Sequence, residues 1–263
     1  MHILLIGIGT GNPEHLTLQA IRALNRADLV LIPRKGPDKA DLADLRRTIC
    51  AGVLDDPARM AEFDMPQRDP ANPSYLERVS DWHDAIAARW AGAIAAHPGA
   101  QVVALLVWGD PSLYDSTLRI AARLEGATVE VIPGLTSPQV LAAAHGIPLN
   151  DLGAPFLVTT GRRLREDGWP AGVDTLVVML DGECSFTGLD PGGVTIWWGA
   201  YVGMEAQITD HGPLAEAGPR IVARRAEARA AHGWIMDIYV LRRPRSPSLR
   251  GAGGDVAIHK GAT

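Results

Sequence analysis

The chain is poor in cysteine and in aromatic residues, and both shortages limit its chemistry. Among its 263 residues there are 2 cysteines, and aromatic residues make up 5% of the composition. Cys50 and Cys184 lie far apart and outside any CxxC or Cys/His cluster. The sequence therefore indicates neither a disulfide framework nor a zinc site, and we expect no bound metal. A reducing cytoplasm fits this cysteine usage best.

Long hydrophobic runs and an excess of one charge are also missing. No apolar run approaches the roughly 20 residues that a membrane-spanning helix needs. The first residues lead straight into a predicted strand, without the basic region and cleavage site of a signal peptide, so we expect a soluble, unexported protein with no membrane partner. The 25 basic and 30 acidic residues give a net charge of −5. This balance lacks the electrostatic footprint of a nucleic-acid-binding protein, and we expect no such partner.

What the chain does contain is an alternation of two patterns. Short β-branched or leucine-rich runs alternate with longer, alanine-rich amphipathic segments, which is typical of βα units around a mostly parallel sheet. The runs predict strands near 2–7, 28–32, 60–64, 101–107, 128–132, 155–160, 174–180, 193–198, 205–209 and 234–242. The amphipathic segments predict helices near 16–26, 38–49, 73–96, 113–124, 137–144 and 215–232.

These elements predict an α/β protein with two α/β domains. The turn "IPGLTSPQ" is the expected joint, because it combines proline, glycine and hydroxyl residues after the fifth predicted strand. We expect an N-terminal domain over 1–135, a C-terminal domain over 136–243 and a flexible tail over 244–263.

The first glycine-bearing strand end is "LLIGIGTGNPEHLTLQA". Ligands of open α/β sheets bind outside the carboxyl ends of the strands, so glycines at these ends are candidate binding loops. The spacing of Gly7, Gly9 and Gly11 fails the dinucleotide fingerprint by one position, because Asn12 stands where the third glycine would. A tight strand-to-helix turn is the alternative interpretation.

Two further strand ends carry polar groups. In "VWGDPSLY", Gly109 permits a close backbone approach and Pro111 disfavours helix at Asp110, so the loop could hold a small polar ligand. The alternative is that Asp110 only caps the following helix. In "IPGLTSPQ", the hydroxyls of Thr136 and Ser137 could bind a ligand, and helix capping explains them equally well.

Taken together, the three strand ends resemble one family. "GIGTGNPEHLT", "GDPSLY" and "PGLTS" match the GxGPGxPxxLT, GDPxxY/F and PGxTS hallmarks of the S-adenosylmethionine-dependent tetrapyrrole methylases of corrin and sirohaem synthesis. Order and spacing also match. Thr10 departs from the pattern, since the family has proline there.

The resemblance implies a homodimeric two-domain α/β methyltransferase, the tetrapyrrole methylase fold. It would bind S-adenosylmethionine in a cofactor cleft between its domains and convert it into S-adenosylhomocysteine. The implied cofactor contacts are Thr10, Trp108, Gly109, Asp110, Leu113, Thr136, Ser137, Leu180 and Ala200.

Within the family, "VVMLDGECSF", "WWGAYVG" and "AHGWIMDIYVLRR" resemble the branch that methylates carbon 1 of precorrin-5 and releases acetate. The implied precorrin substrate carries many carboxylates, which basic side chains would bind. Candidate substrate contacts are Arg34, Lys35, Tyr114, Arg162 and Arg163. The alternative for the two basic clusters is a solvated loop.

Acetate release needs water and would be helped by a general base, which the sequence does not identify. Candidates near predicted strand ends are His15, Tyr114, Asp115, Glu183 and Tyr201. The alternatives for the whole chain are another precorrin methyltransferase, an NADP-dependent reductase suggested by the glycine turn and the Arg34–Lys35 pair, or a non-catalytic tetrapyrrole-binding protein.

Overall fold

The computed structural model describes residues 1–34, 40–66 and 74–244. Lys35 and residues 245–263 of the expected tail lie outside these described residues. Contacts within the chain define two compact units. The first comprises Met1–Ala144 and Tyr201–Gln207, and the second comprises His145–Ala200 and Ile208–Thr263. The limits 1–135 and 136–243, and the cofactor cleft between the domains, stay predictions.

The first unit is built on a parallel sheet, as the alternating pattern predicts. Its strand order is β3-β2-β4-β1-β5, and every pairing is parallel. The strands are β1 (His2–Gly7), β2 (Leu29–Arg34), β3 (Met60–Asp64), β4 (Val102–Val107) and β5 (Thr128–Ile132). The central strands are apolar along their length because helices cover both faces of the sheet. This arrangement places the carboxyl ends of β4, β1 and β5 side by side.

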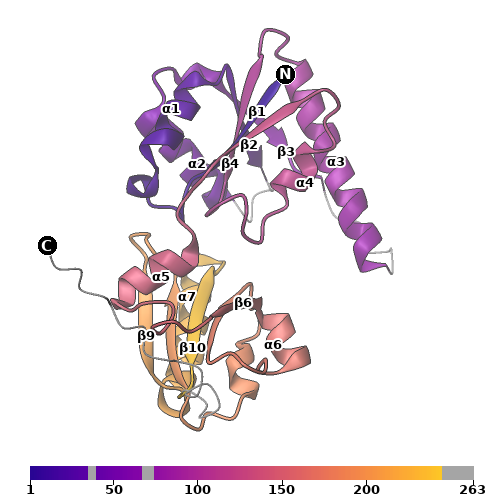
Figure 1. The fold of residues 1–263 in the computed structure, drawn as a ribbon. Coiled ribbons are helices and arrows are strands. Elements are labelled where there is room, and N and C mark those ends of the chain that lie inside the picture. The colour runs from indigo at the N-terminus through magenta and orange to yellow at the C-terminus, as the bar shows by residue number, and fades with distance from the viewer. Residues whose placement is uncertain (35–39, 67–73, 245–263) are drawn as a thin grey trace, which may run out of the picture. The chain divides into compact units, whose positions relative to one another are not determined.

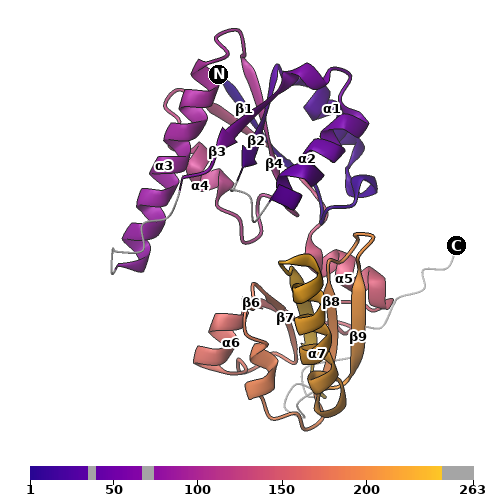
Figure 2. The ribbon, with the colours of Figure 1, turned by 180° about the vertical axis from the view of Figure 1, so that it is seen from behind.

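Helices pack on both faces of this sheet (Figures 1 and 2). The helices that contribute to its cores are α1 (Leu18–Arg26), α2 (Ala40–Val53), α3 (Tyr75–Ala95) and α4 (Thr117–Ala121), and α5 (Ser137–His145) follows β5 along the chain. Leu4 and Ile6 of β1 point to the face that α1 and α2 cover, whereas Ile3 and Leu5 point to α3 and α4. Successive side chains of β1 thus alternate between two separate hydrophobic cores, one on each face of the sheet.

Two predicted helices differ from the observed ones. The helix predicted over 16–26 begins at Leu18, where the Thr17 side chain accepts the N–H of Ala20, and a separate 3-10 turn, Pro13–His15, capped by Asn12, precedes it. The helix expected over 113–124 shrinks to Thr117–Ala121. Tyr114 has a φ of +49°, which no right-handed helix can include, so the chain after Pro111 first forms a loop.

The sheet of the second unit corrects the expectation of a mostly parallel arrangement. Its order is β6-β7-β10-β8-β9, with β6 and β7 parallel and the other pairs antiparallel. The strands are β6 (Leu157–Thr160), β7 (Thr175–Met179), β8 (Thr195–Ala200), β9 (Ile208–Pro213) and β10 (Asp237–Arg242). The link between β8 and β9 is too short for the crossover that parallel neighbours need, so these strands pair antiparallel.

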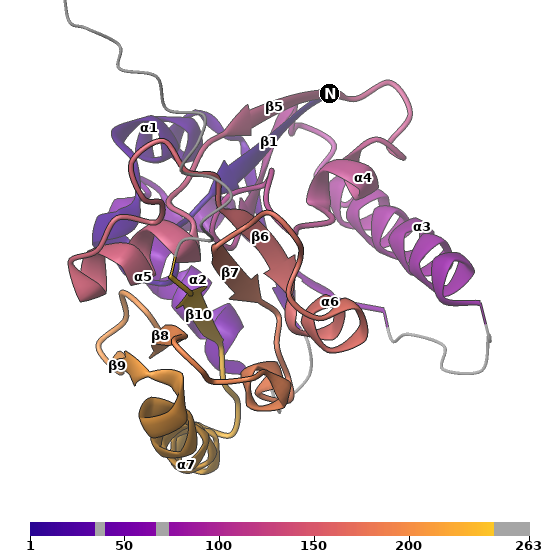
Figure 3. The same ribbon diagram turned by 60° about the horizontal axis from the view of Figure 1, so that its bottom comes forward.

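The helices α6 and α7 belong to the second unit (Figure 3). α7 (Leu214–His232) packs against β8 and β9, and the short α6 (Gly161–Asp167) follows β6. The sequence predicts no helix at α6, because "GRRLRED" is short and rich in charge. Two of its arginines, Arg162 and Arg163, were predicted as substrate contacts, with a solvated loop as the alternative. In the part of the chain that the structure describes, no helix is long and apolar enough to cross a membrane.

Candidate functional site

Three glycine-bearing turns meet at the carboxyl edge of the first sheet. β1 lies between β4 and β5, so the turns that follow these strands are neighbours. The N–H of Gly109 donates to the carbonyl of Gly9 at 2.7 Å, and the N–H of Gly9 donates to the carbonyl of Gly109 at 3.3 Å. These bonds tie the first turn to the loop after β4. The three motifs that the sequence singled out therefore form one continuous backbone surface.

The glycines of these turns are required because the backbones touch. A β-carbon on Gly134 would lie 2.3 Å from the carbonyl oxygen of Gly109, and one on Gly7 would lie 2.6 Å from the nitrogen of Gly134. Real β-carbons do not approach backbone atoms so closely. Gly109 also has a φ of +64°, which favours glycine. The turns are consequently packed without room for a side chain at Gly7 and Gly134, while the backbone conformation favours glycine at position 109.

Asp110 is buried at this junction, and its carboxylate is used within the protein. Oδ1 accepts hydrogen bonds from the N–H and the hydroxyl of Ser112, and Oδ2 accepts the N–H of Gly134 at 2.9 Å. Burial raises the pKa of Asp110, but the bonds from Ser112 and Gly134 outweigh it, so the pKa lies below its ordinary value. Asp110 does not cap a helix, since none begins at that point. It ties the loop after β4 to the turn after β5.

Thr10 lies on the first turn beside two neighbours that hold it. Its side chain is 9% exposed, and its hydroxyl lies 3.3 Å from Nδ1 of His15. Gly203, in the segment Tyr201–Gln207 of the same unit, packs against both residues. A β-carbon there would lie 2.4 Å from Cε1 of His15 and 2.7 Å from the Thr10 hydroxyl. Thr10 and His15 are thus fixed in place by a glycine from a distant part of the chain.

Trp108 stands at the start of the loop after β4 and contacts a buried arginine. The guanidinium of Arg46, on α2, lies 5.1 Å from the centre of the Trp108 ring. Burial lowers the pKa of Arg46 to about 10, while Asp115 acts in the opposite direction. At pH 7 Arg46 is still charged, so a cation is kept beneath this loop. No sequence pattern pointed to Arg46.

The remaining predicted contacts of the first unit lie on the same turns. Leu113 closes a turn by donating its N–H to the carbonyl of Asp110. The N–H and hydroxyl of Thr136 both donate to Oε1 of Gln139, at 2.9 and 2.8 Å, which is the reciprocal bond of a capping box and supports the capping interpretation for Thr136. Ser137 begins α5. Tyr114 is 46% exposed in its left-handed conformation.

In the second unit, the predicted contacts lie at two strand ends. Leu180 directly follows β7, has a φ of +53° and is 67% exposed. Ala200 is fully buried at the end of β8 and pairs with Ile208 and Asp237. Left-handed residues other than glycine and strained backbones cluster at functional sites, so Leu180 is a notable position.

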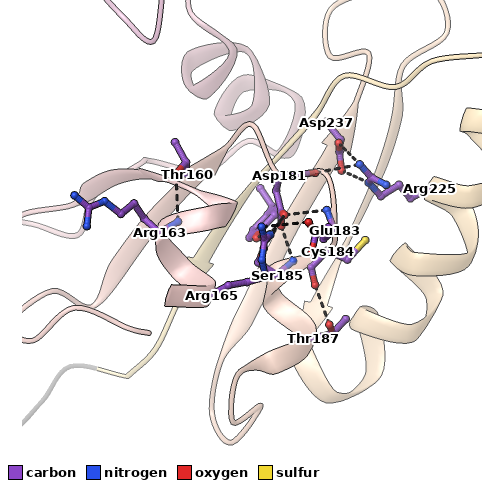
Figure 4. A network of polar contacts seen from close by, with 11 residues as sticks. Thr160, Arg163, Arg165, Asp181, Glu183, Cys184, Ser185, Thr187, Arg225 and Asp237 are labelled. Carbon is purple, nitrogen blue, oxygen red and sulfur yellow. Dashed lines mark hydrogen bonds and ion pairs between the residues drawn. The ribbon is translucent and has the colours of Figure 1, made fainter. Parts of the chain in front are cut away.

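A polar network that the sequence reasoning missed surrounds the loop after Leu180 (Figure 4). At its centre is the carboxylate of Asp181, whose side chain is 2% exposed. Donors to this carboxylate come from Arg165, Glu183, Ser185 and Tyr239. Next to it, Arg225 pairs with Asp237 at 2.8 Å. One sequence feature could have revealed this network: in "VVMLDGECS" an aspartate directly follows an apolar strand and is itself followed by glycine and serine.

The basic residues proposed for the substrate are paired on exposed surfaces. Arg162 and Arg163 of α6 are 61% and 63% exposed and pair with Glu166 and Asp167, one helical turn away. Arg34 lies at the end of β2 and pairs with Glu62 and Asp64 on β3. Lys35 lies outside the described residues.

The candidate bases differ in how their polar atoms are occupied. The carboxylate of Asp115 accepts the N–H and hydroxyl of Thr117, and Glu183 pairs with Arg165 at 3.3 Å. Tyr201 is 2% exposed. His15 and Tyr114 lie on or beside the turns of the first unit.

Among residues 1–34, 40–66 and 74–244, no group of three or more His, Cys, Asp or Glu side chains is placed to hold a metal ion.

Several known proteins are similar to this chain in sequence and in fold. Precorrin-6A synthase [deacetylating] of Sinorhizobium sp is 49% identical over 248 residues, which cover 92% of this chain and 95% of that protein. The crystal structure of CobF from Corynebacterium diphtheriae, described as related to cobalamin synthesis, superposes with a TM-score of 0.78 at 39% identity and covers 92% of this chain and 99% of its own. A chloroplastic relative of Arabidopsis thaliana, named an S-adenosyl-L-methionine-dependent uroporphyrinogen III methyltransferase, is 28% identical over 85% of this chain and 53% of its own length.

The three turns at the carboxyl edge of the first sheet carry the motifs of one enzyme family. A model of the tetrapyrrole (corrin/porphyrin) methylases matches residues 2–218 and so includes all three turns and the ends of β7 and β8. The chain belongs to the tetrapyrrole (corrin/porphyrin) methylase family.

Proposed function

We propose that this chain methylates carbon 1 of precorrin-5 and releases acetate, with S-adenosylmethionine as methyl donor and precorrin-6A and S-adenosylhomocysteine as products. The observation that carries the proposal is the 49% identity to a deacetylating precorrin-6A synthase over nearly the full length of both chains. The segments "VVMLDGECSF" and "WWGAYVG" support the same branch. The name of the Arabidopsis relative supports the methyl donor.

The turns of the first unit suit the binding of a polar cofactor. Methyl transfer from a sulfonium to a ring carbon depends on in-line positioning and on exclusion of water more than on an activated side-chain nucleophile. Because glycine carries no side chain at these turns, a ligand can approach their main chain closely. The proposed cofactor contacts on these turns and on the second unit are Thr10, Trp108, Gly109, Asp110, Leu113, Thr136, Ser137, Leu180 and Ala200.

Acetate release requires a second chemical event. A hydroxyl from water adds to the acetyl carbonyl, the bond from this carbonyl to the ring carbon breaks, and the electron pair of that bond stays on the ring carbon, which takes the methyl group. A base that removes the proton of the water would accelerate this step. The candidates to test are His15, Tyr114, Asp115, Glu183 and Tyr201. The carboxylate of Asp115 accepts from Thr117, that of Glu183 pairs with Arg165, and Nδ1 of His15 lies 3.3 Å from the Thr10 hydroxyl, so a base among these three would act together with its partner.

The proposed reaction is tested by incubating the purified chain with precorrin-5 and S-adenosylmethionine. We expect the tetrapyrrole product to gain one methyl group and lose one acetyl group, with S-adenosylhomocysteine and acetate formed in equal amounts. Methyl gain without acetyl loss would assign the chain to another precorrin methylation. Tight precorrin binding without any S-adenosylhomocysteine would support a tetrapyrrole-binding protein and overturn the enzyme.

The remaining expectations concern substrate contacts, assembly and location. We propose Arg34, Lys35, Tyr114, Arg162 and Arg163 as contacts of the substrate carboxylates, and a cytoplasmic homodimer as the working form. The resemblance to the family supports both. Light scattering after size-exclusion chromatography measures the mass directly, and a value near twice the 28.0 kDa of one chain is expected.

A further inference from the structure

Leu180 combines two features that cost stability. Its φ of +53° lies in the left-handed region, which a residue with a β-carbon disfavours, and its apolar side chain is 67% exposed. Strained residues of this kind persist only where the surrounding structure determines their conformation. A specific interaction must therefore hold the chain at the end of β7.

The interaction is made by the next residue, Asp181. Its carboxylate accepts the N–H of Ser185 at 2.6 Å, the hydroxyl of Ser185 at 2.6 Å and the N–H of Glu183 at 3.1 Å. The loop 181–185 thus winds around the carboxylate of its own first residue. Such a turn sets the direction of the chain immediately after Leu180.

Three other elements of the second unit anchor the same residue (Figure 4). The hydroxyl of Tyr239 on β10 donates to the carboxylate at 2.7 Å, and Arg165 on α6 does so at 3.3 Å. Arg225 on α7 donates to the backbone carbonyl of Asp181 at 3.0 Å. Gly161 allows this packing, because a β-carbon there would lie 2.2 Å from Oδ1 of Asp181. Asp181 is consequently held by α6, α7 and β10 together.

The network continues to the second predicted cofactor position of this unit. Arg225 also pairs with Asp237, and the indole N–H of Trp198 donates to Asp237 at 3.0 Å. Asp237 is the register partner of Ala200. One set of hydrogen bonds therefore links the end of β7, where Leu180 lies, to the end of β8, where Ala200 lies.

We propose that Asp181 is a positioning residue for the methyl donor: its buried carboxylate holds Leu180 in the left-handed conformation and so sets the surface that Leu180 presents to S-adenosylmethionine. This inference rests on the proposed function, in which Leu180 contacts the cofactor. Asp181 itself makes no contact with the ligand, because both of its oxygens are occupied by donors of the protein.

A double-mutant cycle separates positioning from general stabilisation. S-adenosylmethionine affinity is measured by calorimetry for the wild type, Asp181→Asn, Leu180→Gly and the double variant. Asparagine replaces one acceptor oxygen by a donor, so it cannot satisfy all the groups that face the carboxylate. We expect Asp181→Asn to weaken binding about tenfold or more in the wild-type background. Glycine adopts the left-handed conformation without help, so with Gly at 180 the same change should weaken binding about threefold or less.

Asp174 supplies the matched control. It is a second buried carboxylate, it flanks the opposite end of β7, and it pairs with Arg243 at 3.2 Å. Both Asp174→Asn and Asp181→Asn should lower the thermal unfolding midpoint, but Asp174→Asn should leave S-adenosylmethionine affinity unchanged. A loss of affinity that merely followed stability would appear in both variants and would overturn the proposal.

Two milder variants keep the test decisive if Asp181→Asn does not fold. Ser185→Ala removes a donor from within the loop, and Tyr239→Phe removes one from β10, so the first should weaken S-adenosylmethionine binding more than the second. Equal affinity in both variants and the wild type would overturn the inference while the proposed reaction stands. A wild-type chain that binds no S-adenosylmethionine would instead overturn the proposed function, and the inference with it.

Discussion

The carboxylate of Asp110, a residue of the second motif, holds the backbone of two neighbouring loops in place. Its carboxylate is occupied by Ser112 and by Gly134, so removing it releases the loop after β4 from the turn after β5. We expect Asp110→Ala to weaken S-adenosylmethionine binding about tenfold and to lower the free energy of unfolding by about 1–3 kcal/mol, because buried donors lose their acceptor. Calorimetric titration and urea unfolding measure the two effects.

Asp28 provides the control for this prediction. It also accepts two backbone N–H groups, those of Gln101 and Val102, but it does so before β4, at the opposite end of that strand. Asp28→Ala should cost stability without changing the affinity for S-adenosylmethionine. If Asp110→Ala bound the cofactor as tightly as the wild type, the loop after β4 would not be part of the site.

Gly134 carries a second prediction at this scale. A β-carbon would lie 2.3 Å from the carbonyl oxygen of Gly109 and 2.7 Å from the carbonyl carbon of Gly7, so Gly134→Ala must push the turns apart. We expect a loss of about 1–3 kcal/mol in the free energy of unfolding and weaker S-adenosylmethionine binding.

A glycine with free space should behave in the opposite way. Nothing lies within 4 Å of a β-carbon built on Gly92, which is inside α3. Gly92→Ala should therefore stabilise the protein by roughly 0.5–1 kcal/mol. Thermal unfolding of both variants measures the contrast, and equal destabilisation would contradict the proposed close packing of the turns.

At the scale of elements, α6 presents its arginines in two different ways. Arg163 pairs on the surface with Asp167, and such exposed pairs contribute about 0.3–0.5 kcal/mol. Arg165 instead reaches the buried carboxylate of Asp181 and the hydroxyl of Ser185. We expect Arg165→Ala to lower the free energy of unfolding by about 1–3 kcal/mol and Arg163→Ala by less than about 0.5 kcal/mol.

The same helix tests the substrate proposal. Replacing Arg162 and Arg163 together by alanine should leave S-adenosylmethionine affinity unchanged, since the proposed cofactor contacts lie on other strand ends. If the pair binds substrate carboxylates, precorrin affinity should fall more than about tenfold. Unchanged precorrin affinity would show that these arginines only face solvent, and the search would move to Arg34 and Lys35.

Across the whole molecule, hydrogen-bonded carboxylates predict a loss of stability in acid. The pKa values of Asp110, Asp181 and Asp210 lie below their ordinary values, because hydrogen bonds to the charged forms outweigh the effect of burial. Their contribution is present above the ordinary carboxyl pKa of about 4 and is lost as the pH falls through the lowered values. We expect the free energy of unfolding to fall steeply below about pH 4.

Urea unfolding at several pH values between 7 and 3 measures this dependence. The Asp181→Asn variant removes one of the responsible groups, so its stability should fall less between pH 5 and pH 3 than that of the wild type. Identical slopes for the two proteins would show that Asp181 keeps an ordinary pKa in the folded state.

Local patterns were sufficient to predict the parallel sheet of the first unit. The runs of β1 and β4 are apolar along their whole length, so both faces of these strands must be buried under helices. Strands buried on both faces are typical of a parallel sheet, and the parallel order could therefore be predicted from the runs alone. The glycines of three motifs, Gly7, Gly109 and Gly134, also marked the turns after β1, β4 and β5, and the structure brings these turns together at one edge of the sheet. That the turns bind a ligand stays a prediction. The start of the helix predicted over 113–124 was wrong and α6 was not predicted, since short segments of this kind have too little periodicity to indicate a helix.

The amino-acid sequence by itself thus determined the α/β class, the parallel first sheet and the family motifs, all of which depend on residues near one another along the chain. Tertiary structure alone decided that β10 lies between β7 and β8, that Arg165 turns inward while Arg163 faces solvent, and that the carboxylate of Asp181 meets Tyr239. These outcomes join residues that are far apart in sequence. Which buried donor reaches which carboxylate is set by the packing of whole elements, and no local pattern records it.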